Sequence, residues 1–191
     1  MGNYAKVKQG SGCSGRNVHR ANARKRINAM IHPTAVIGPN VTIGRNCYIG
    51  PFCVIGMMPE HCDHLDKDCG VVIGDNCVLY KAVVIDSGIF QKTAIEGGCH
   101  LKSGSHVGHD ARVCAGVTLA PKAVVGGHSV VGVEANIGIG AVIHQKVMIP
   151  GRCMIGMNAV VTKKAAEQMR VCETWAGVPA KKIGMNKKYQ I

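Results

Sequence analysis

Aromatic residues are scarce in this sequence, where one Trp, two Phe and four Tyr make up 4% of the 191 residues. Single-stranded nucleic acids are commonly bound by aromatic side chains on which the bases stack, so this scarcity argues against a nucleic-acid partner. Long apolar runs are also missing. A membrane-spanning helix needs about 18 or more apolar residues in a row, so we expect no such helix and no membrane partner. Charged residues make up only 18%, but hydrophobic residues reach 47%, which excludes a disordered chain.

Acidic residues are absent from residues 1–30, which hold seven Lys or Arg. We predict that this stretch is a basic flexible arm, and its role as an added segment, a regulatory extension or a targeting peptide stays open. Residues 31–162 carry nine basic and nine acidic residues, whereas residues 163–191 carry seven basic and two acidic ones. A neutral body is not the charged face of a nucleic-acid-binding protein. The basic C-terminal end suits a ligand that bears phosphate.

A secretory signal peptide is also missing, because the first apolar stretch begins only near Met30. Ten cysteines in a short chain would otherwise suggest a disulfide framework or a metal site. Without a signal peptide, a reducing compartment is the better expectation, and we predict a cytoplasmic protein.

A six-residue repeat runs through most of the chain. Aliphatic residues recur every sixth position from Ile31 to Val161, apart from an interruption at residues 57–72 and a four-residue slip within residues 86–94. All 20 positions in this phase are Ile, Leu or Val, and ten of them are followed directly by Gly. The residue four positions later is small or slim. Five of the cysteines occupy that small position, namely Cys47, Cys53, Cys77, Cys99 and Cys153.

One large and one small inward residue in every six predicts short flat strands joined by sharp corners, with three strands in each coil of 18 residues. This pattern is the signature of an all-β, single-stranded parallel β-helix, which we place at residues 31–162. The two interruptions predict two protruding loops, and loops on a rigid scaffold often carry function. Residues 163–191 lose the repeat and are predicted to form a short C-terminal helix and loop that cap the β-helix.

Two motifs stand out from the repeat. They are Ser105-His106-Val107-Gly108-His109-Asp110 and Trp175-Ala176-Gly177-Val178-Pro179-Ala180-Lys181. With them, residues 31–183 resemble the hexapeptide-repeat acyltransferase superfamily, whose β-helix is left-handed. The centre resembles the UDP-N-acetylglucosamine acyltransferases, which it also matches at Gly127-His128 and His144-Gln145. The tail resembles acetyl-CoA-dependent sugar acetyltransferases.

The resemblance implies a catalytic centre. His109 would be the general base, since an imidazole can take the proton that an attacking amine or hydroxyl loses at neutral pH. Asp110 would orient that ring, and the backbone N–H of Gly127 would stabilise the oxyanion. The remaining candidate substrate contacts are His106, His128, His144 and Gln145 on the coils, and His61 and Asp63 in the first loop.

The resemblance also implies the two substrates and the assembly. The tail would bind acetyl-CoA through Gly177, Pro179, Ala180, Lys181 and Lys182, with the two lysines meeting its phosphates as point charges. The chain would move an acetyl or other short acyl group from a CoA thioester to an amino or hydroxyl group of a sugar, preferably a nucleotide-linked one. No metal is expected. A homotrimer is expected, with each site between two subunits.

Three alternatives stay open. The first is a UDP-N-acetylglucosamine O-acyltransferase that uses an acyl carrier protein as donor. Two departures weigh against it: His61 stands where that family has an acidic residue, and Asp86 stands where it has a histidine. The second is a metalloenzyme like the γ-class carbonic anhydrases, which share the fold but need a second histidine where this chain has Ser105. The third is a structural or binding β-helix without catalysis.

Overall fold

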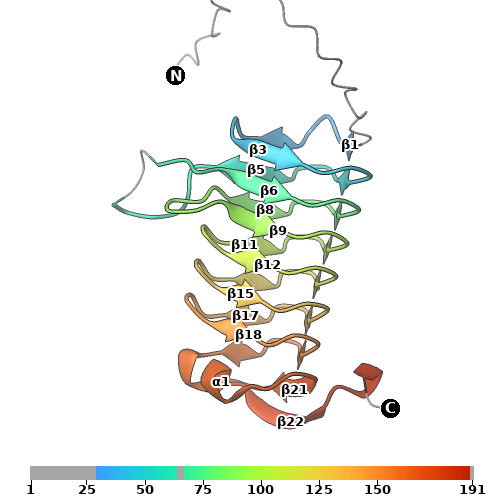
Figure 1. The fold of residues 1–191 in the computed structure, drawn as a ribbon, viewed down its shortest axis with the longest axis vertical. Helices are drawn as coiled ribbons and strands as arrows, with labels where there is room; N and C mark the ends of the chain where they lie inside the picture. The colour runs from blue at the N-terminus through green and yellow to red at the C-terminus, as the bar shows by residue number, and fades with distance from the viewer. Residues whose placement is uncertain (1–28, 64–66, 190–191) are drawn as a thin grey trace, which may run out of the picture.

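The computed structural model describes residues 29–63 and 67–189. The chain winds as a left-handed parallel β-helix, a triangular prism with three flat parallel sheets as its faces (Figure 1). The predicted basic arm, residues 1–30, lies outside the described residues except for its last two positions, and the first strand already begins at Met30.

The strands follow one another around the prism, so every third strand belongs to the same sheet. Sheet A contains β1 (Met30–Ile31), β4 (Tyr48–Ile49), β7 (Val78–Leu79), β10 (His100–Leu101), β13 (Thr118–Leu119), β16 (Asn136–Ile137), β19 (Met154–Ile155), β21 (Glu173–Ala176) and β22 (Lys181–Met185). Sheet B contains β2 (Val36–Ile37), β5 (Val54–Met57), β8 (Val84–Asp86), β11 (His106–Val107), β14 (Val124–Val125), β17 (Val142–Ile143) and β20 (Val160–Val161). Sheet C contains β3 (Val41–Ile43), β6 (Val71–Ile73), β9 (Thr93–Ile95), β12 (Arg112–Val113), β15 (Val130–Val131) and β18 (Met148–Ile149).

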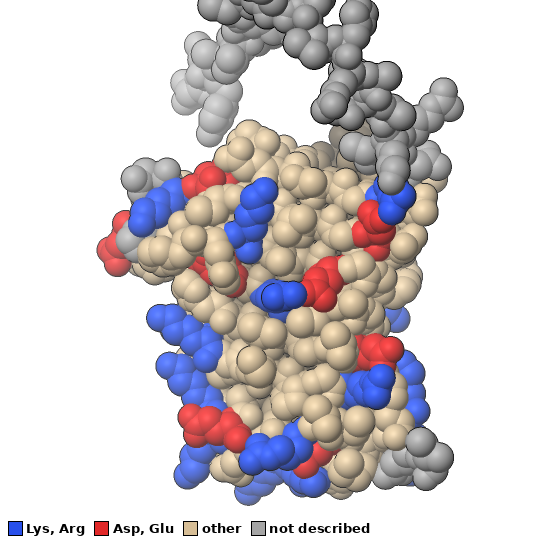
Figure 2. All heavy atoms as spheres, viewed as in Figure 1, with Lys and Arg blue, Asp and Glu red and all other residues tan. Residues whose placement is uncertain are grey.

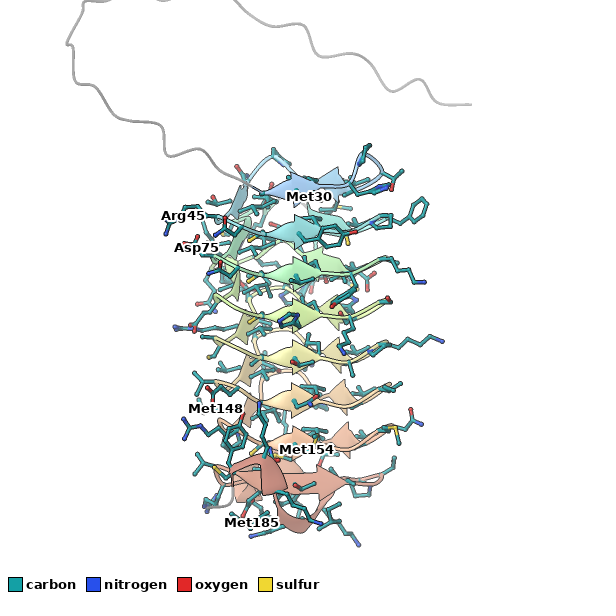
Figure 3. All side chains as sticks on the ribbon, turned by 90° about the vertical axis from the view of Figure 1, so that its right-hand side faces the viewer. Met30, Arg45, Asp75, Met148, Met154 and Met185 are labelled. Atoms are coloured by element: carbon teal, nitrogen blue, oxygen red, sulfur yellow. The ribbon has the colours of Figure 1, made fainter. Side chains whose placement is uncertain are left out.

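The repeat is the core of the prism. Every aliphatic residue in the predicted phase from Ile49 to Val161 is at most 1% exposed. Aliphatic residues in the first coils are less covered, and Ile31 is 44% exposed, because they lie at the N-terminal end of the described solenoid. The five cysteines of the small position are all buried, as their interpretation as core residues predicts. Corner residues can pair on the outside of the prism. Arg45 and Asp75, which lie on neighbouring coils, form an ion pair there (Figure 3).

The two interruptions of the repeat are loops on one edge of the prism (Figure 1). Loop 1, residues 58–70, joins β5 to β6, and residues 64–66 within it are not described. Loop 2, residues 87–92, joins β8 to β9. The two loops are tied together, since the Gly70 N–H donates to Ser87 Oγ (2.8 Å) and Ser87 Oγ hydrogen-bonds to a carboxylate oxygen of Asp68.

The C-terminal segment closes the other end. Helix α1 (Lys163–Gln168) is capped by Thr162, whose side chain accepts from the Ala165 N–H. Strand β21 then pairs with β19, so the tail adds one more parallel strand to sheet A before β22 returns antiparallel. A 3-10 turn, η1 (Lys187–Tyr189), follows. Lys and Arg outnumber Asp and Glu at this end (Figure 2). The described residues contain no helix with the length and hydrophobicity of a membrane span.

Two serines, Ser105 and Ser129, occupy the small inward position, and they differ in their hydrogen bonding. Ser129 Oγ donates to the carbonyl of His144 (2.9 Å) and accepts from the Val147 N–H, whereas buried Ser105 Oγ has no hydrogen-bond partner among the described residues. An unsatisfied buried polar group costs about 1–3 kcal/mol. We therefore expect Ser105→Ala to raise the free energy of unfolding by about 1 kcal/mol and Ser129→Ala to lower it by a similar amount, as measured by denaturant unfolding. Equal destabilisation by both variants would contradict this.

Candidate active site

One edge of the prism carries most of the candidate residues. It is the row of corners between sheet B and sheet C, where both loops also emerge. Descending this edge below loop 2, successive corners hold His109 with Asp110, Gly127 with His128, and Gln145 with Lys146. Helix α1 follows β20 at the same edge. Residues about 18 apart in sequence therefore lie one coil apart, about 4.8 Å along the prism.

Asp110 is the best-anchored side chain of the site. Its Oδ1 accepts three consecutive backbone N–H groups from loop 2, those of Ile89, Phe90 and Gln91, at 2.8–3.1 Å. Its own N–H donates to Thr93 Oγ1 (2.9 Å), and the residue is 1% exposed. Burial alone would raise the pKa of Asp110, but its hydrogen bonds with His109 and the loop N–H groups more than offset this, so the pKa lies below the usual range. The carboxyl is thus ionised near neutral pH.

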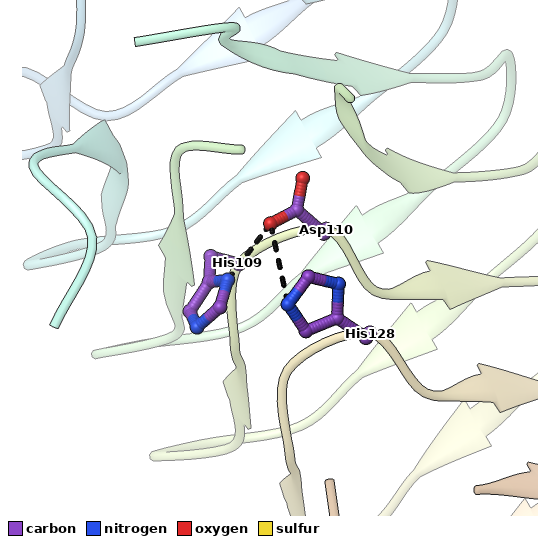
Figure 4. A group of neighbouring side chains, drawn as sticks. All are labelled: His109, Asp110 and His128. Carbon is purple, nitrogen blue, oxygen red and sulfur yellow. Dashed lines mark hydrogen bonds and ion pairs between the residues drawn. The ribbon is translucent and has the colours of Figure 1, made fainter. Parts of the chain in front are cut away.

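The ring of His109 is oriented by this carboxylate (Figure 4). Nδ1 lies 2.8 Å from Asp110 Oδ2. An ionised carboxylate can only accept, so Nδ1 must be the donor, and in the neutral ring the lone pair is then on Nε2. Nε2 faces the next coil, where a Cβ added to Gly127 would lie 2.9 Å from it. Any side chain at position 127 would displace the ring, so glycine is required here for steric reasons. His109 is 8% exposed, and its basic nitrogen is pre-set toward Gly127.

Three further rings surround this centre. His128 lies edge-on to His109 with 4.9 Å between the ring centroids, and its Nε2 is 3.8 Å from Asp110 Oδ2. His61 from loop 1 lies edge-on to His109 at 5.5 Å. Phe90 from loop 2 stacks on His128 at 6.0 Å. Burial is the largest effect on His128 and lowers its pKa, against the attraction of Asp110. The lowered pKa favours the neutral form of His128 beside His109.

The backbone N–H of Gly127 is the candidate oxyanion donor. Gly127 is buried, and no hydrogen bond among the described residues uses its N–H as donor. Equivalent first residues of other corners show what this N–H binds, since the Ala115 N–H donates to Glu96 Oε2 (2.9 Å) and the Arg45 N–H to Asp75 Oδ1 (2.7 Å). In these two corners the backbone N–H donates to an anionic oxygen. The same role is expected for the N–H of Gly127.

The other coil residues predicted as substrate contacts are more dispersed. His106 lies on the outward face of β11, where its Nε2 is 3.2 Å from Asp86 Oδ2. This hydrogen bond raises the pKa of His106, against the opposing effect of burial. His144 is exposed and hydrogen-bonds through Nδ1 to the Gln145 carbonyl (2.8 Å), one coil below His128. Neither His144 nor Gln145 contacts the His109 cluster, although both lie on the same edge.

Of the two loop 1 candidates, only His61 is brought to His109. His61 contacts His109, whereas Asp63 is exposed and its backbone N–H donates to His61 Nδ1 (3.2 Å).

Three contributors were not expected from the sequence: Asp86 as partner of His106, Phe90 beside His128, and Thr93 beneath Asp110. Asp86 stands out in the sequence as a departure from the family pattern, but nothing in the repeat indicates what it contacts.

The predicted donor residues line a pocket at the C-terminal end. It has a volume of about 330 Å³ and is bounded by α1 on one side and by Trp175, Pro179, Ala180, Lys181 and Lys182 on the other. Gly177 is exposed in the turn before Pro179. Lys182 Nζ is 2.6 Å from Glu173 Oε1, and this buried glutamate also accepts from Trp175 Nε1 (2.9 Å). Lys182 is therefore already paired, and Lys181 and Lys164 are the pocket lysines with no ion pair among the described residues.

One group of side chains has the composition of a metal site. Ligand atoms of His109, Asp110 and His128 all lie within 4.8 Å of one another. However, Asp110 Oδ1 is fully engaged by loop 2, and Asp110 Oδ2 with His109 Nδ1 already forms a hydrogen bond. These contacts satisfy both groups without an ion and leave His109 Nε2 facing Gly127, an arrangement suited to a general base. Metal analysis of the purified protein distinguishes the two interpretations.

Comparisons with known proteins agree with the repeat and the fold. Residues 27–56 match the family model described as bacterial transferase hexapeptide (six repeats). UDP-N-acetylglucosamine O-acyltransferase from Moraxella catarrhalis is 26% identical, with a TM-score of 0.68, and the match covers 84% of this chain and 72% of that one. A perosamine N-acetyltransferase variant from Caulobacter crescentus, solved with CoA and GDP-perosamine, is 25% identical, with a TM-score of 0.52 and coverage of 83% and 57%. No curated protein matches the sequence.

Repeat, fold and comparisons together define the chain as a hexapeptide-repeat protein with a left-handed β-helix. The hexapeptide transferase model and the acyltransferases among the similar solved structures support an acyltransferase.

Proposed function

We propose that the protein transfers an acetyl or other short acyl group from a CoA thioester to an amino or hydroxyl group of a sugar, preferably a nucleotide-linked one, with His109 as general base. The observation that carries this proposal is the fixed orientation of His109, whose Nδ1 is held by Asp110 while Nε2 faces Gly127. Solved relatives that act on UDP-N-acetylglucosamine, or that were solved with CoA and GDP-perosamine, support the sugar as acceptor.

The reaction follows from this geometry. The acceptor oxygen or nitrogen attacks the thioester carbonyl and gives its proton to His109 Nε2, which becomes an imidazolium stabilised by Asp110. The carbonyl oxygen becomes an oxyanion, which the Gly127 N–H can receive as the corner N–H of Ala115 receives a carboxylate oxygen. When the C–S bond breaks, the thiolate takes the proton back from His109. The products are the acylated sugar and CoA with a free thiol.

The donor fits along the edge of the prism. From the coil of β11, which carries His109, to the coil of β20, which leads into the tail pocket, there are three coil steps, or about 14 Å. An extended donor with its thioester at one end and phosphates at the other suits this separation. Lysines 146, 163, 164 and 181 are exposed between Gly127 and the far side of the pocket. The positive charge therefore lies where the phosphates of acetyl-CoA are needed, and it is compatible with a carrier-protein donor as well.

Lys181 allows the donor assignment to be tested. It is exposed and unpaired among the described residues, so we expect it to contact a phosphate as a point charge. An exposed charge pair contributes about 0.2–1 kcal/mol, so Lys181→Ala should raise the KM for acetyl-CoA about twofold to fivefold and leave the KM for the sugar unchanged. Lys187→Ala, an exposed lysine outside the pocket, is the matched control. Equal changes in both Michaelis constants would assign the tail to capping alone.

The acceptor would lie between the base and the loops. His61, Asp63, His106 and His128 are the candidate contacts there, and His144 and Gln145 lie one coil nearer the donor. A screen with acetyl-CoA and a panel of amino and hydroxyl sugars, free and nucleotide-linked, tests the proposal directly through release of the CoA thiol. No turnover with any thioester and sugar pair would overturn it. The nine free cysteines of the described residues suit a reducing compartment, so we propose the cytoplasm.

We also propose a homotrimer. Parallel sheets are normally covered on both faces, yet the outward residues of sheet B are a column of valines interrupted by His106, and two of them, Val36 and Val142, are 48% and 40% exposed. A neighbouring copy packed on this face would cover the valines and lie beside His109 at its edge. Light scattering should give three times the monomer mass, and Val142→Glu should reduce both assembly and activity. A fully active monomer at micromolar concentration would contradict this.

A further inference from the structure

A second cluster of unexplained side chains lies on a different edge of the prism, between sheets A and B. The chain has only seven aromatic residues, yet Tyr48, Phe52 and Tyr80 gather there on two neighbouring coils. They are 37%, 66% and 41% exposed, so none of them serves the core. The aromatic content of the whole chain is too low for a nucleic-acid surface. These three neighbouring side chains are nevertheless enough for the flat ring of a single ligand to stack on them.

These residues border a hollow in the surface. A pocket of about 400 Å³ is lined by Tyr48, Pro51, Tyr80, Lys81 and Ser103. Beside this hollow, Gly50 aligns with Tyr80 on the next coil, as the register of β4 with β7 shows. A Cβ at position 50 would lie 2.7 Å from the Tyr80 carbonyl oxygen, so the glycine is required for the coils to stack. Arg45 and Asp75, labelled in Figure 3, precede β4 and β7, whereas Pro51 and Lys81 of the pocket follow these two strands.

The lining selects the chemistry of a ligand. No carboxylate and no amide side chain lines the pocket, so it lacks the acceptors that commonly bind sugar hydroxyl groups. The polar groups present are the Lys81 ammonium and the hydroxyls of Tyr48, Tyr80 and Ser103, none of which has an ion-pair or hydrogen-bond partner among the described residues. Flat rings stack on aromatic faces, and a lysine meets phosphate as a point charge.

We infer that this pocket is a binding site for a nucleoside monophosphate, with the base against Tyr48 and Tyr80 and the phosphate at Lys81. The site is separate from the candidate active site, which lies on the edge between sheets B and C. It does not depend on the acyl-transfer reaction, so the inference can fail while the proposed function holds.

Binding of AMP, adenosine and ribose 5-phosphate to the intact full-length protein, measured by calorimetry, tests the assignment. AMP should bind most tightly, adenosine more weakly and ribose 5-phosphate weakest. Loss of one stacked base costs about 1–3 kcal/mol, so Tyr80→Ala and Tyr48→Ala should each weaken AMP binding at least about fivefold. Lys81→Ala should bring the affinities for AMP and adenosine together. Tyr189→Ala, which removes a tyrosine from the opposite end of the chain, is the control and should change nothing.

Three results would overturn the inference. The first is the absence of AMP binding at millimolar concentration. The second is equal binding of AMP and ribose 5-phosphate, which would leave the tyrosines without a role. The third is AMP binding that both tyrosine variants leave unchanged, which would locate the nucleotide elsewhere, for instance in the tail pocket. The thermal unfolding of each variant should match that of the parent protein, because the altered side chains are exposed.

Discussion

Replacement of His109 by Ala is expected to lower kcat by about 10²–10⁴-fold, the usual contribution of a general base. The acceptor would still bind, but no group would be in place to take its proton as the new bond forms. His109 is a corner residue outside the aliphatic ladder, so the melting temperature should change little. Steady-state kinetics with acetyl-CoA and the best acceptor, together with thermal unfolding of the same samples, measure both effects.

His106→Ala is the matched control for this variant. His106 is bonded to Asp86, and nothing in its contacts aligns it with Gly127, so its loss should affect KM for the acceptor more than kcat. If His106→Ala abolished turnover while His109→Ala stayed near normal, the base would be wrongly assigned. If both variants kept full activity, general-base catalysis on this edge would have to be abandoned.

Asp110→Asn is expected to cost a similar factor of about 10²–10⁴ in kcat while the loop stays folded. The amide oxygen can still accept the three N–H groups of loop 2, and Asn tolerates the positive φ of this corner (59°). The amide NH₂, however, would donate to His109 Nδ1 and force the proton of the neutral ring onto Nε2. The ring could then no longer act as a base, and kcat should fall without a matching rise in KM.

Asp110→Ala separates this positioning role from a structural one. It leaves three N–H groups of residues 89–91 without their acceptor, at about 1–3 kcal/mol for each that stays buried, so it should lower the free energy of unfolding by more than about 2 kcal/mol. The folded pKa of Asp110 is depressed, so its contribution to stability is present above the unfolded pKa of about 3.9 and is lost as the pH falls through the folded value. A stable, fully active Asp110→Asn protein would refute the role proposed for the carboxylate.

The coils of this protein are predictable from its sequence because their interior admits few residue types. Each inward position packs against the coils above and below it and against the inward residues of the other two sheets, so Ile, Leu and Val recur regularly from Ile49 to Val161. The strand lengths, the two loops and the loss of the repeat near residue 163 follow from the same pattern. The extra strand β21 does not, since it joins sheet A through a buried Trp175 instead of an aliphatic residue.

The candidate site is only partly predictable, for a physical reason. His109 and Asp110 occupy one corner, and Gly127 lies three hexads, or one complete coil, after His109, so the repeat alone brings them onto one edge. The loops obey no period, and their contacts are set by local hydrogen bonds, such as those of residues 89–91 with Asp110. For the same reason the sequence does not indicate that Glu173 pairs with Lys182, or that His144 lies apart from the other rings.

The regular stacking of coils also fixes the distances between sites along the prism. Every 18 residues advance the edge by one fixed increment of about 4.8 Å, so the reach between Gly127 and the tail pocket can change only in whole coils. Inserting or deleting one complete coil between β14 and β17 would preserve the ladder, the corners and His109, yet under the proposed function it would shift the tail pocket out of register with a donor of fixed length. In that proposal donor length is set by the number of coils, and it can be altered without touching any residue of the site.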